Sequence, residues 1–167
     1  MNIFFLDRCP FTAARHQHDK HVVKMCLETA QILCTVGHSV SAQVPYKPTH
    51  AKHPSVLWAG ANCHNFEWLV DHGLGLCDEY THRYGKVHAC QRVIDGLQHV
   101  GRLLPFTLWT DPPQCMPPEY QCPNDPVLAY RTYYIQCKIS QSKWTNREPP
   151  YFVLDSLLPS TGIKSMV

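Results

Sequence analysis

The sequence predicts a mainly α-helical fold, a single compact helical domain crossed by an irregular segment rich in proline and aromatic residues. Three observations predict it: helical periodicity over residues 16–38, a second periodic zone over 54–84, and seven prolines between residues 105 and 126. Proline interrupts helices and central strands, so side-chain packing must order that last segment. We expect one domain over residues 1–159 and a loose tail over 160–167.

The first element is a short apolar segment, residues 2–6, expected to be a buried strand or an extended lead-in. The principal helix follows, from His16 to His38, a stretch without proline. At 100° per residue its polar side chains share one narrow sector, and apolar side chains fill most of the remaining circumference. The polar side chains are Gln17, His21, Lys24, Glu28, Gln31 and Thr35. Because this polar strip is narrow, we expect the helix to be largely buried and the strip to face a groove.

Residues 39–53 are predicted to form a connecting loop, because they contain two prolines and no periodicity. A loop this long is often functional. The helical zone over 54–84 is expected to break near Asn62 and to end at Gly85. Inside it, Gly73 indicates the close approach of another backbone, since glycine lowers helix propensity.

The remaining elements are predicted from caps and breakers. A helix is expected over 87–104, and a last helix over 127–143, which Asp125 would cap. Two further prolines, at 149 and 150, are expected to finish the fold. No internal repeat and no second domain are found in the sequence.

Composition limits the function. The chain has 167 residues, 44% hydrophobic and 17% charged, which is typical of a globular protein. The net charge of +2 does not by itself indicate capture of duplex DNA, because duplex binders usually carry a basic stripe. Nine scattered cysteines without C-x-x-C indicate buried thiols in a reducing compartment. With no signal peptide and no membrane span, we expect a cytosolic protein that does not bind membranes; its oligomeric state does not follow from the sequence.

The strongest candidate for chemistry is the Lys24–Glu28 pair, spaced i,i+4 on the principal helix. Ionised groups are costly to bury without a partner, and perturbed carboxylates and lysines in clefts are the usual acid–base groups. The alternative is a solvated salt bridge worth a few tenths of a kcal/mol. We take Glu28, Lys24 and His21 as the candidate catalytic residues.

Four clusters interleave cations with aromatic side chains, a combination that suits a phosphate and a base. The alternative is that the aromatics are core and the cations extend from it to solvent. The candidate ligand-binding residues are Gln31, Lys47, His50, His53, Trp58, Glu79, Arg83, Tyr84, Lys86, Tyr130, Arg131, Tyr134 and Lys138.

Metal and cofactor sites are not expected. His16, His18 and His21 are spaced H-x-H and H-x-x-H, which a helix does not direct at one ion. The sequence contains no G-x-S-x-G, Walker loop or G-x-G-x-x-G, so serine hydrolase, kinase and Rossmann-type functions have no support.

Two motifs carry a family resemblance. The opening M-N-I-F-F-L-D, followed by K-H-V-V-K-M-C-L-E-T-A-Q-I-L, resembles the start of the pyrimidine-dimer DNA glycosylase (endonuclease V) family of phages and bacteria. The segments Tyr46–Pro54 and Glu79–Tyr84 are loosely similar. Over most of the chain, D-K-H-V-V-K-M, Y-K-P-T-H, E-Y-T-x-R-Y-G-K-x-H and A-Y-R-x-Y-Y also resemble a group of small phage proteins, a resemblance that implies no activity.

The glycosylase resemblance implies a compact helical fold in which an N-terminal amine attacks the sugar carbon and forms a Schiff base. Glu28 matches the family glutamate that assists ring opening and proton transfer. The amine would be that of Met1. Leu27 stands where the family has a basic residue, and Lys24 lies one turn earlier on the face of Glu28.

We therefore expect a phage-type protein that acts on a nucleobase or nucleotide, cleaving an N-glycosidic bond. Its partner would be a nucleotide or a nucleic-acid base, with duplex DNA possible. Two alternatives remain open. The first is a non-catalytic anti-defence protein that sequesters a small nucleotide signal, and the second is an interaction protein that uses the proline-rich segment.

Overall fold

Helices account for the whole regular structure of the described residues. The computed structural model describes residues 1–158, with Gln141 as backbone alone, and this part contains seven α-helices and no β-strand. The predicted all-α fold is therefore confirmed; the expected tail, 160–167, lies outside the described residues, and the domain boundary stays a prediction. The α-helices are α1 (Pro10–His16), α2 (Asp19–Ser39), α3 (Pro54–Ala61), α4 (Cys63–Tyr84), α5 (Gln91–Gly96), α6 (Pro126–Cys137) and α7 (Tyr151–Leu157), with 3-10 helices η1 (Gln98–Leu103), η2 (Pro118–Tyr120) and η3 (Ile139–Gln141).

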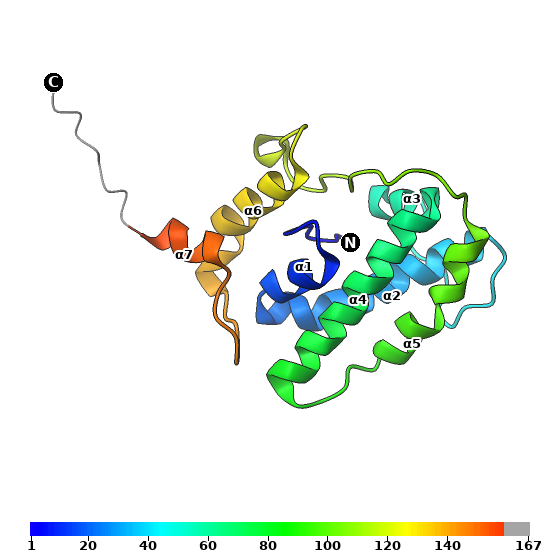
Figure 1. Cartoon of the computed structure of the whole chain (residues 1–167), viewed down its shortest axis with the longest axis horizontal. Coiled ribbons are helices and arrows are strands. Elements are labelled where there is room, and N and C mark those ends of the chain that lie inside the picture. Colours follow the sequence, from blue (N-terminus) through cyan, green and yellow to red (C-terminus); the bar gives the residue numbers. More distant parts are fainter. Residues whose placement is uncertain (159–167) are drawn as a thin grey trace, which may run out of the picture.

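The two long helices, α2 and α4, pack against each other, and α1 lies against α4 (Figure 1). The approach is close at Gly73, where an added Cβ would stand 2.7 Å from Thr29 Cγ2, so a larger residue would push the helices apart. The expectation of a close neighbour at this glycine is confirmed, although a side chain rather than a backbone makes the contact. None of the described helices is long and apolar enough to cross a membrane.

The predicted break near Asn62 and the predicted end at Gly85 are both confirmed. The side chain of Asn62 accepts a hydrogen bond from Asn65 N–H at the start of α4. Gly85 has φ +65°, a left-handed conformation in which glycine avoids the cost of a Cβ.

The principal helix differs from the prediction in its first turn. It breaks at Gln17, and α2 begins only at Asp19. The reason is tertiary, because the Gln17 side chain is buried and donates to Ile3 O instead of lying on a polar helix face. Val23 and Leu27 are 42% and 45% exposed, so the outer face of α2 is wider than the thin polar strip implies.

The predictions for the second half are only partly right. The helix expected over 87–104 is wrong in its length: regular α-helix is confined to α5, and η1 continues it as a 3-10 helix. The helix expected over 127–143 stops at Cys137. Asp125 caps it as predicted, accepting from Leu128 N–H. The prolines at 149 and 150 do not finish the fold, because Pro150 is the N-cap of α7.

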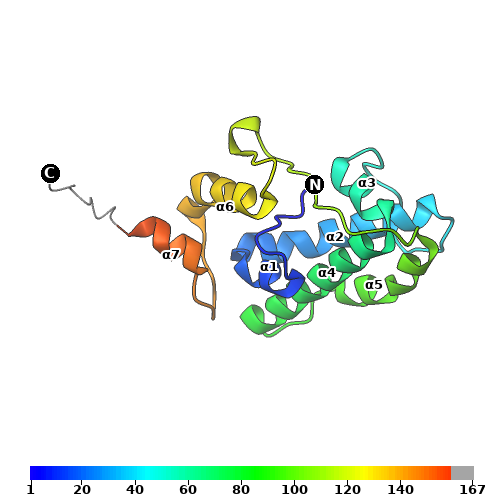
Figure 2. The same ribbon diagram turned by 45° about the horizontal axis from the view of Figure 1, so that its top comes forward.

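The N-terminal segment is an irregular lead-in rather than a strand, since it has no ladder partner among the described residues and turns at Phe4, where φ is +57°. It is nevertheless core, with Ile3, Phe5 and Leu6 all at 1% exposure or less. Figures 1 and 2 show it between α6 and α3, with the amino terminus near the centre of the molecule. The chain's first atoms are therefore held in a fixed place.

The proline-rich segment is irregular, as predicted, and its aromatic and polar side chains attach it to the helices. Trp109 packs edge-on against Trp58, whose ring N–H donates to Thr110 O at 2.8 Å. Asn65 holds the same threonine through its backbone and its hydroxyl. The nine cysteines are all free, which agrees with the sequence-based expectation of thiols rather than disulfides.

Candidate active site

Glu28 lies at the centre of a small polar group on α2. Its Oε1 pairs with Lys24 Nζ at 2.9 Å, and its Oε2 lies 3.9 Å from the Met1 amine. The backbone N–H of Asn2 donates to the same Oε2 at 3.1 Å. The glutamate side chain is 12% exposed, whereas Lys24 is 68% exposed. The Glu28 carboxylate is therefore largely buried, whereas the Lys24 side chain is exposed to solvent.

The sequence positions the amine through Asn2. The side-chain oxygen of Asn2 accepts from the N–H groups of Ile3 and Phe4, and its side-chain amide donates to Cys115 O at 2.9 Å. The second contact ties the first residues to the proline-rich segment across the site. Because Asn2 is held on both sides, the amine keeps a defined distance from Glu28.

His53 is the next titratable group in this electrostatic neighbourhood. Burial lowers its pKa, the positive amino terminus and His50 lower it further, and Glu28 acts in the opposite direction. Its Nδ1 accepts from Ser55 N–H at 3.1 Å, so the neutral ring carries its proton on Nε2. Neutral His53 is thus a hydrogen-bond donor rather than a cation.

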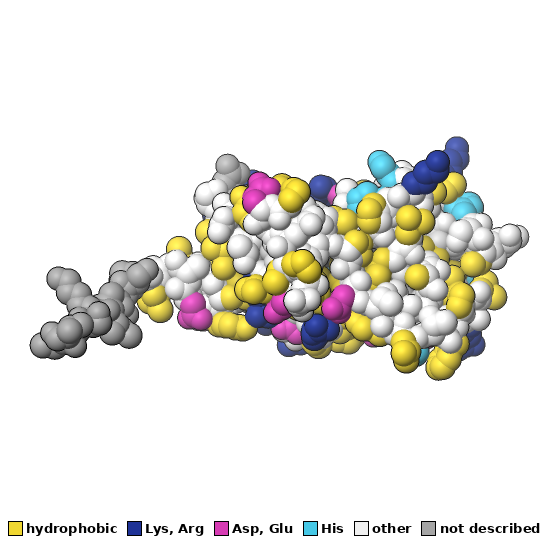
Figure 3. All heavy atoms as spheres, turned by 90° about the horizontal axis from the view of Figure 1, so that it is seen from above, with side chains coloured by type: hydrophobic (Ala, Val, Ile, Leu, Met, Phe, Trp, Pro, Cys, Tyr) yellow, Lys and Arg dark blue, Asp and Glu magenta, His cyan; other side chains and the backbone are white. Residues whose placement is uncertain are grey.

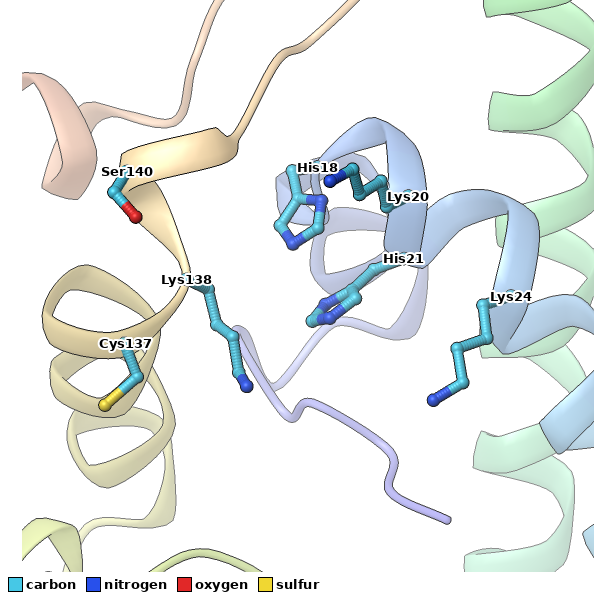
Figure 4. A pocket seen from close by; sticks show the side chains of 7 residues that line it. All are labelled: His18, Lys20, His21, Lys24, Cys137, Lys138 and Ser140. Carbon is cyan, nitrogen blue, oxygen red and sulfur yellow. The ribbon is translucent and has the colours of Figure 1, made fainter.

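A cavity of about 400 Å³ opens beside this group, between the start of α2 and the end of α6 (Figure 4). Its lining includes His21 and Lys138, two predicted site residues, together with Lys24. Lys24 belongs to both the cavity and the pair with Glu28. The structure therefore brings all three predicted catalytic residues, Glu28, Lys24 and His21, to one face of α2.

Glu79 and Arg83 lie elsewhere, in an ion cluster at the end of α4. Arg83 contacts Glu79 Oε2 and Asp19 Oδ1, both at 3.0 Å, and donates to a backbone carbonyl of α1 at 3.1 Å. Arg147 holds the second oxygen of Glu79. The Arg83 side chain is fully buried. These contacts bind the Arg83 guanidinium to groups within the protein, so the cluster is structural.

Arg131 fastens the N-terminal segment to α6 and α7. It donates to Leu6 O at 2.8 Å and Asp7 Oδ2 at 3.0 Å, and it lies 4.9 Å from the centre of the Phe152 ring. Its hydrogen bonds reach chain positions about 125 residues away, which holds α6 against the start of the chain. This contact positions the amine side of the molecule and leaves Arg131 outside the Glu28 group.

The other predicted residues fall into two sets. The first set is core: Trp58, Tyr130 and Tyr134. The second set is half buried or exposed and, among the described residues, forms no hydrogen bond or ion pair with Glu28: Gln31 on α2, Lys47 and His50 in the loop, and Tyr84 and Lys86 at the end of α4. Thr49 joins the loop to α2, because its N–H donates to Thr35 Oγ1 at 3.1 Å.

One group of the described residues has the composition of a metal site. Cys26, Cys77 and His88 have ligand atoms within 4.8 Å of one another. The Cys77 thiol donates to Cys26 Sγ at 3.7 Å, and this contact together with burial raises the pKa of the Cys26 thiol. His88 Nδ1 already accepts from the Cys90 N–H. Metals bind thiolates, and the raised pKa of Cys26 disfavours its thiolate; the group lies on the side of α2 away from Glu28.

Sequence reasoning did not select Asn2, His18 or Lys20, although the structure places each beside the site. Asn2 carries no pattern signal, since its role comes from contacts with distant backbone. His18 is one of the closely spaced histidines that could suggest a metal site, and Lys20 belongs to D-K-H-V-V-K-M, a motif that carries a family resemblance but implies no binding role for this lysine. The N-cap position of His18 explains why it faces the cavity.

The sequence is similar to that of a known protein family. The family model described as pyrimidine dimer DNA glycosylase matches residues 1–92, more than half of the chain. The protein belongs to this family. The match covers the N-terminal segment, α2, the loop and α4, and so includes Met1 and Glu28. No curated protein and no solved structure matches the chain. The predicted resemblance to the glycosylase family is thereby confirmed, and the family supports DNA glycosylase-like activity at a coarse level.

Proposed function

We propose that the protein is a DNA glycosylase that cleaves the N-glycosidic bond of a dimerised pyrimidine, with the Met1 amine as nucleophile and Glu28 as the acid–base group. Membership of the family supports the class of reaction. The single observation that carries the residue assignment is the Met1 amine 3.9 Å from a half-buried carboxylate. A nucleophile and its base form the usual pair in covalent catalysis, and their separation is often longer than a hydrogen bond before substrate binds.

The first step needs a neutral amine, because an ammonium has no lone pair. Glu28 Oε2 is placed to receive the proton, while Lys24 holds Oε1. The amine nitrogen then forms a bond to the sugar C1′ as the bond from C1′ to the base breaks. The bonding electrons leave with the base, which takes up the proton that the positively charged nitrogen then loses.

The second step converts this adduct into a Schiff base. The remaining N–H proton leaves the nitrogen, the C=N bond forms, and the C1′–O4′ bond of the ring breaks. Its electron pair stays on O4′, which receives a proton, and Glu28 is the group at hand to deliver one. Neutral His53 can donate a hydrogen bond to the sugar or phosphate from Nε2.

Borohydride trapping tests the proposal directly. The protein is incubated with a duplex containing one cyclobutane pyrimidine dimer, and in parallel with a duplex containing an abasic site. Borohydride then reduces the Schiff base to a stable amine. We expect a covalent adduct with both duplexes and, after digestion, mass spectrometry that places it on the Met1 peptide.

A matched pair of variants controls the experiment. Glu28→Gln should abolish most of the trapping, whereas Glu67→Gln makes the same chemical change at an exposed glutamate paired only with His64 and should trap normally. Duplex binding without an adduct from either substrate would overturn the proposal and favour the nucleotide-sequestering alternative.

A further inference from the structure

The cavity beside Glu28 has a lining whose charge is of one sign. Besides Lys24 and Lys138, Lys20 and His18 contribute to it, and no carboxylate lines it. Figure 4 shows Lys20 and Lys24 extending from α2 and Lys138 from the end of α6, with the two histidine rings between them. Three lysines line about 400 Å³, one of them Lys24, which pairs with Glu28 at 2.9 Å, and this cationic lining attracts an anion.

The two histidines are hydrogen-bonding groups rather than charges. Burial lowers the pKa of His18 to about 4 and that of His21 to about 3; in His21 the neighbouring His18, Lys138 and Lys24 act in the same direction. The rings lie 4.0 Å apart, and His21 also stacks on Phe4 at 4.1 Å. Both rings are therefore neutral at pH 7 and rigidly held.

The ring protons can be assigned from the contacts. Tyr134 Oη accepts the His18 backbone N–H at 2.9 Å and lies 3.0 Å from His21 Nδ1. We assign the Tyr134 proton to that second contact, which leaves the His21 proton on Nε2. His18 is 95% buried, and its Nδ1 has no hydrogen-bond partner among the described residues. The cavity wall thus holds both a free donor and an unpaired polar atom.

We propose that this cavity binds a phosphate oxyanion, and that the phosphate is one of the damaged DNA strand near the reacting sugar. The identification of the strand rests on the proposed glycosylase function. Lys24 lines the cavity and its Nζ lies 2.9 Å from Glu28 Oε1, so a phosphate bound there lies close to the carboxylate proposed to act on the sugar.

This site also explains how a protein of net charge +2 can hold DNA. Figure 3 shows lysines and arginines at separated places on a largely uncharged face instead of a continuous stripe. The three lysines that line the cavity supply a local attraction for a phosphate that the small net charge does not. Lys138 lies beyond residue 92, so this contact comes from outside the part of the chain that the family model matches.

Salt-dependent binding tests the inference without relying on catalysis. The probe is a duplex with one tetrahydrofuran abasic analogue, which cannot form a Schiff base, measured by fluorescence anisotropy across a salt series. We expect Lys138→Gln to weaken binding about five- to tenfold and to reduce the slope of log K against log salt by about 1. The double variant Lys20→Gln/Lys138→Gln should reduce this slope by about 2. Arg92→Gln, an exposed cation of α5, is the charge-matched control.

A backbone scan then identifies the phosphate. Single methylphosphonate linkages are placed at successive positions around the analogue, and at one position the neutral linkage should weaken wild-type binding but not binding by the double variant. Equal slopes for wild type and double variant, or the absence of any such position, would overturn the inference. Loss of borohydride trapping with these salt effects intact would defeat the proposed function alone.

Inorganic phosphate distinguishes the source of the oxyanion. Titration of the unliganded protein should shift the imidazole C2–H resonances of His18 and His21 at millimolar phosphate, and the abasic duplex should compete for them. Submillimolar phosphate binding that the duplex does not displace would overturn the assignment to DNA and indicate a free phosphate ligand.

Discussion

Two glutamate–cation pairs of the same i,i+4 spacing occupy different settings in this protein. Lys24–Glu28 lies beside the amino terminus with its lysine in solvent, while Glu79–Arg83 lies under the end of α4 with both partners buried. Arg83 has two carboxylates and a backbone carbonyl as partners, and Glu79 has Arg147 as well. Glu28 also has several partners, namely Lys24, the Met1 amine and the Asn2 N–H, but its lysine is 68% exposed. The burial of the cation, not the spacing, separates the pair proposed to act in catalysis from the structural one.

The largest expected effect comes from removing the reactive carboxylate. Glu28→Gln keeps the volume and shape of the side chain but removes the base, so activity should fall about 10²- to 10⁴-fold. Stability should change by under about 1 kcal/mol, since the lysine partner is exposed. Single-turnover cleavage of a dimer-containing duplex, together with the melting temperature, measures both. Wild-type activity in this variant would remove α2 from the site.

The opposite result is expected in the buried cluster. Arg83→Met removes a cation that two carboxylates share, leaving Asp19 without its ion pair and Glu79 with Arg147 alone in a buried setting. Breaking such a buried pair costs about 3–5 kcal/mol, which urea denaturation would measure. Trapping per folded molecule should stay at the wild-type level. A stable Arg83→Met protein that no longer traps DNA would reverse the roles assigned to the two pairs.

The sequence predicted the helical fold and the helix boundaries at Asn62, Gly85 and Asp125, because caps and breakers act locally. It could not separate the two ion pairs. Asp19, which pairs with Arg83, and Arg147, which pairs with Glu79, are each 64 residues from Arg83, in opposite directions along the chain. Only the folded chain brings them together.

Other errors have the same origin. The break at Gln17 depends on a hydrogen bond to Ile3 O, and the order of α7 depends on the contact of Phe152 with Arg131. Neither contact produces a periodic pattern in the sequence. The amine beside Glu28 was expected only from the family resemblance, because a chain terminus has no pattern of its own.

The stability of the protein should depend on pH, because a buried histidine, His72, supports the N-terminal segment that carries the Met1 amine. His72 Nε2 lies 3.1 Å from the Gln17 amide that donates to Ile3 O, and burial lowers the pKa of His72 to about 3. Between about pH 6.5 and 3 the unfolded chain binds a proton here and the folded chain does not. Stability should therefore fall as pH falls through this range, by about 2 kcal/mol at pH 5 from this group alone.

Urea denaturation at pH 7 and pH 5 measures the loss. The pKa values of His18 and His21 are shifted in the same direction, so the total should exceed the share of His72. A nuclear magnetic resonance titration identifies the group, because the His72 ring should remain neutral in the folded protein above pH 5. Titration of that ring near pH 6.5 would contradict the prediction.

The smallest expected effect is that of Lys24→Met, and it decides which amine is the nucleophile. Lys24 Nζ contacts Glu28 Oε1 at 2.9 Å, but the lysine is 68% exposed, so losing the contact should cost under about 1 kcal/mol. If Met1 supplies the nucleophile, Lys24→Met still forms the borohydride adduct, with cleavage reduced less than about tenfold through the altered setting of Glu28. If Lys24 were the nucleophile, the adduct would vanish. Mass spectrometry of trapped wild-type protein gives the same decision independently, by placing the adduct on the Met1 peptide or on the peptide that contains Lys24.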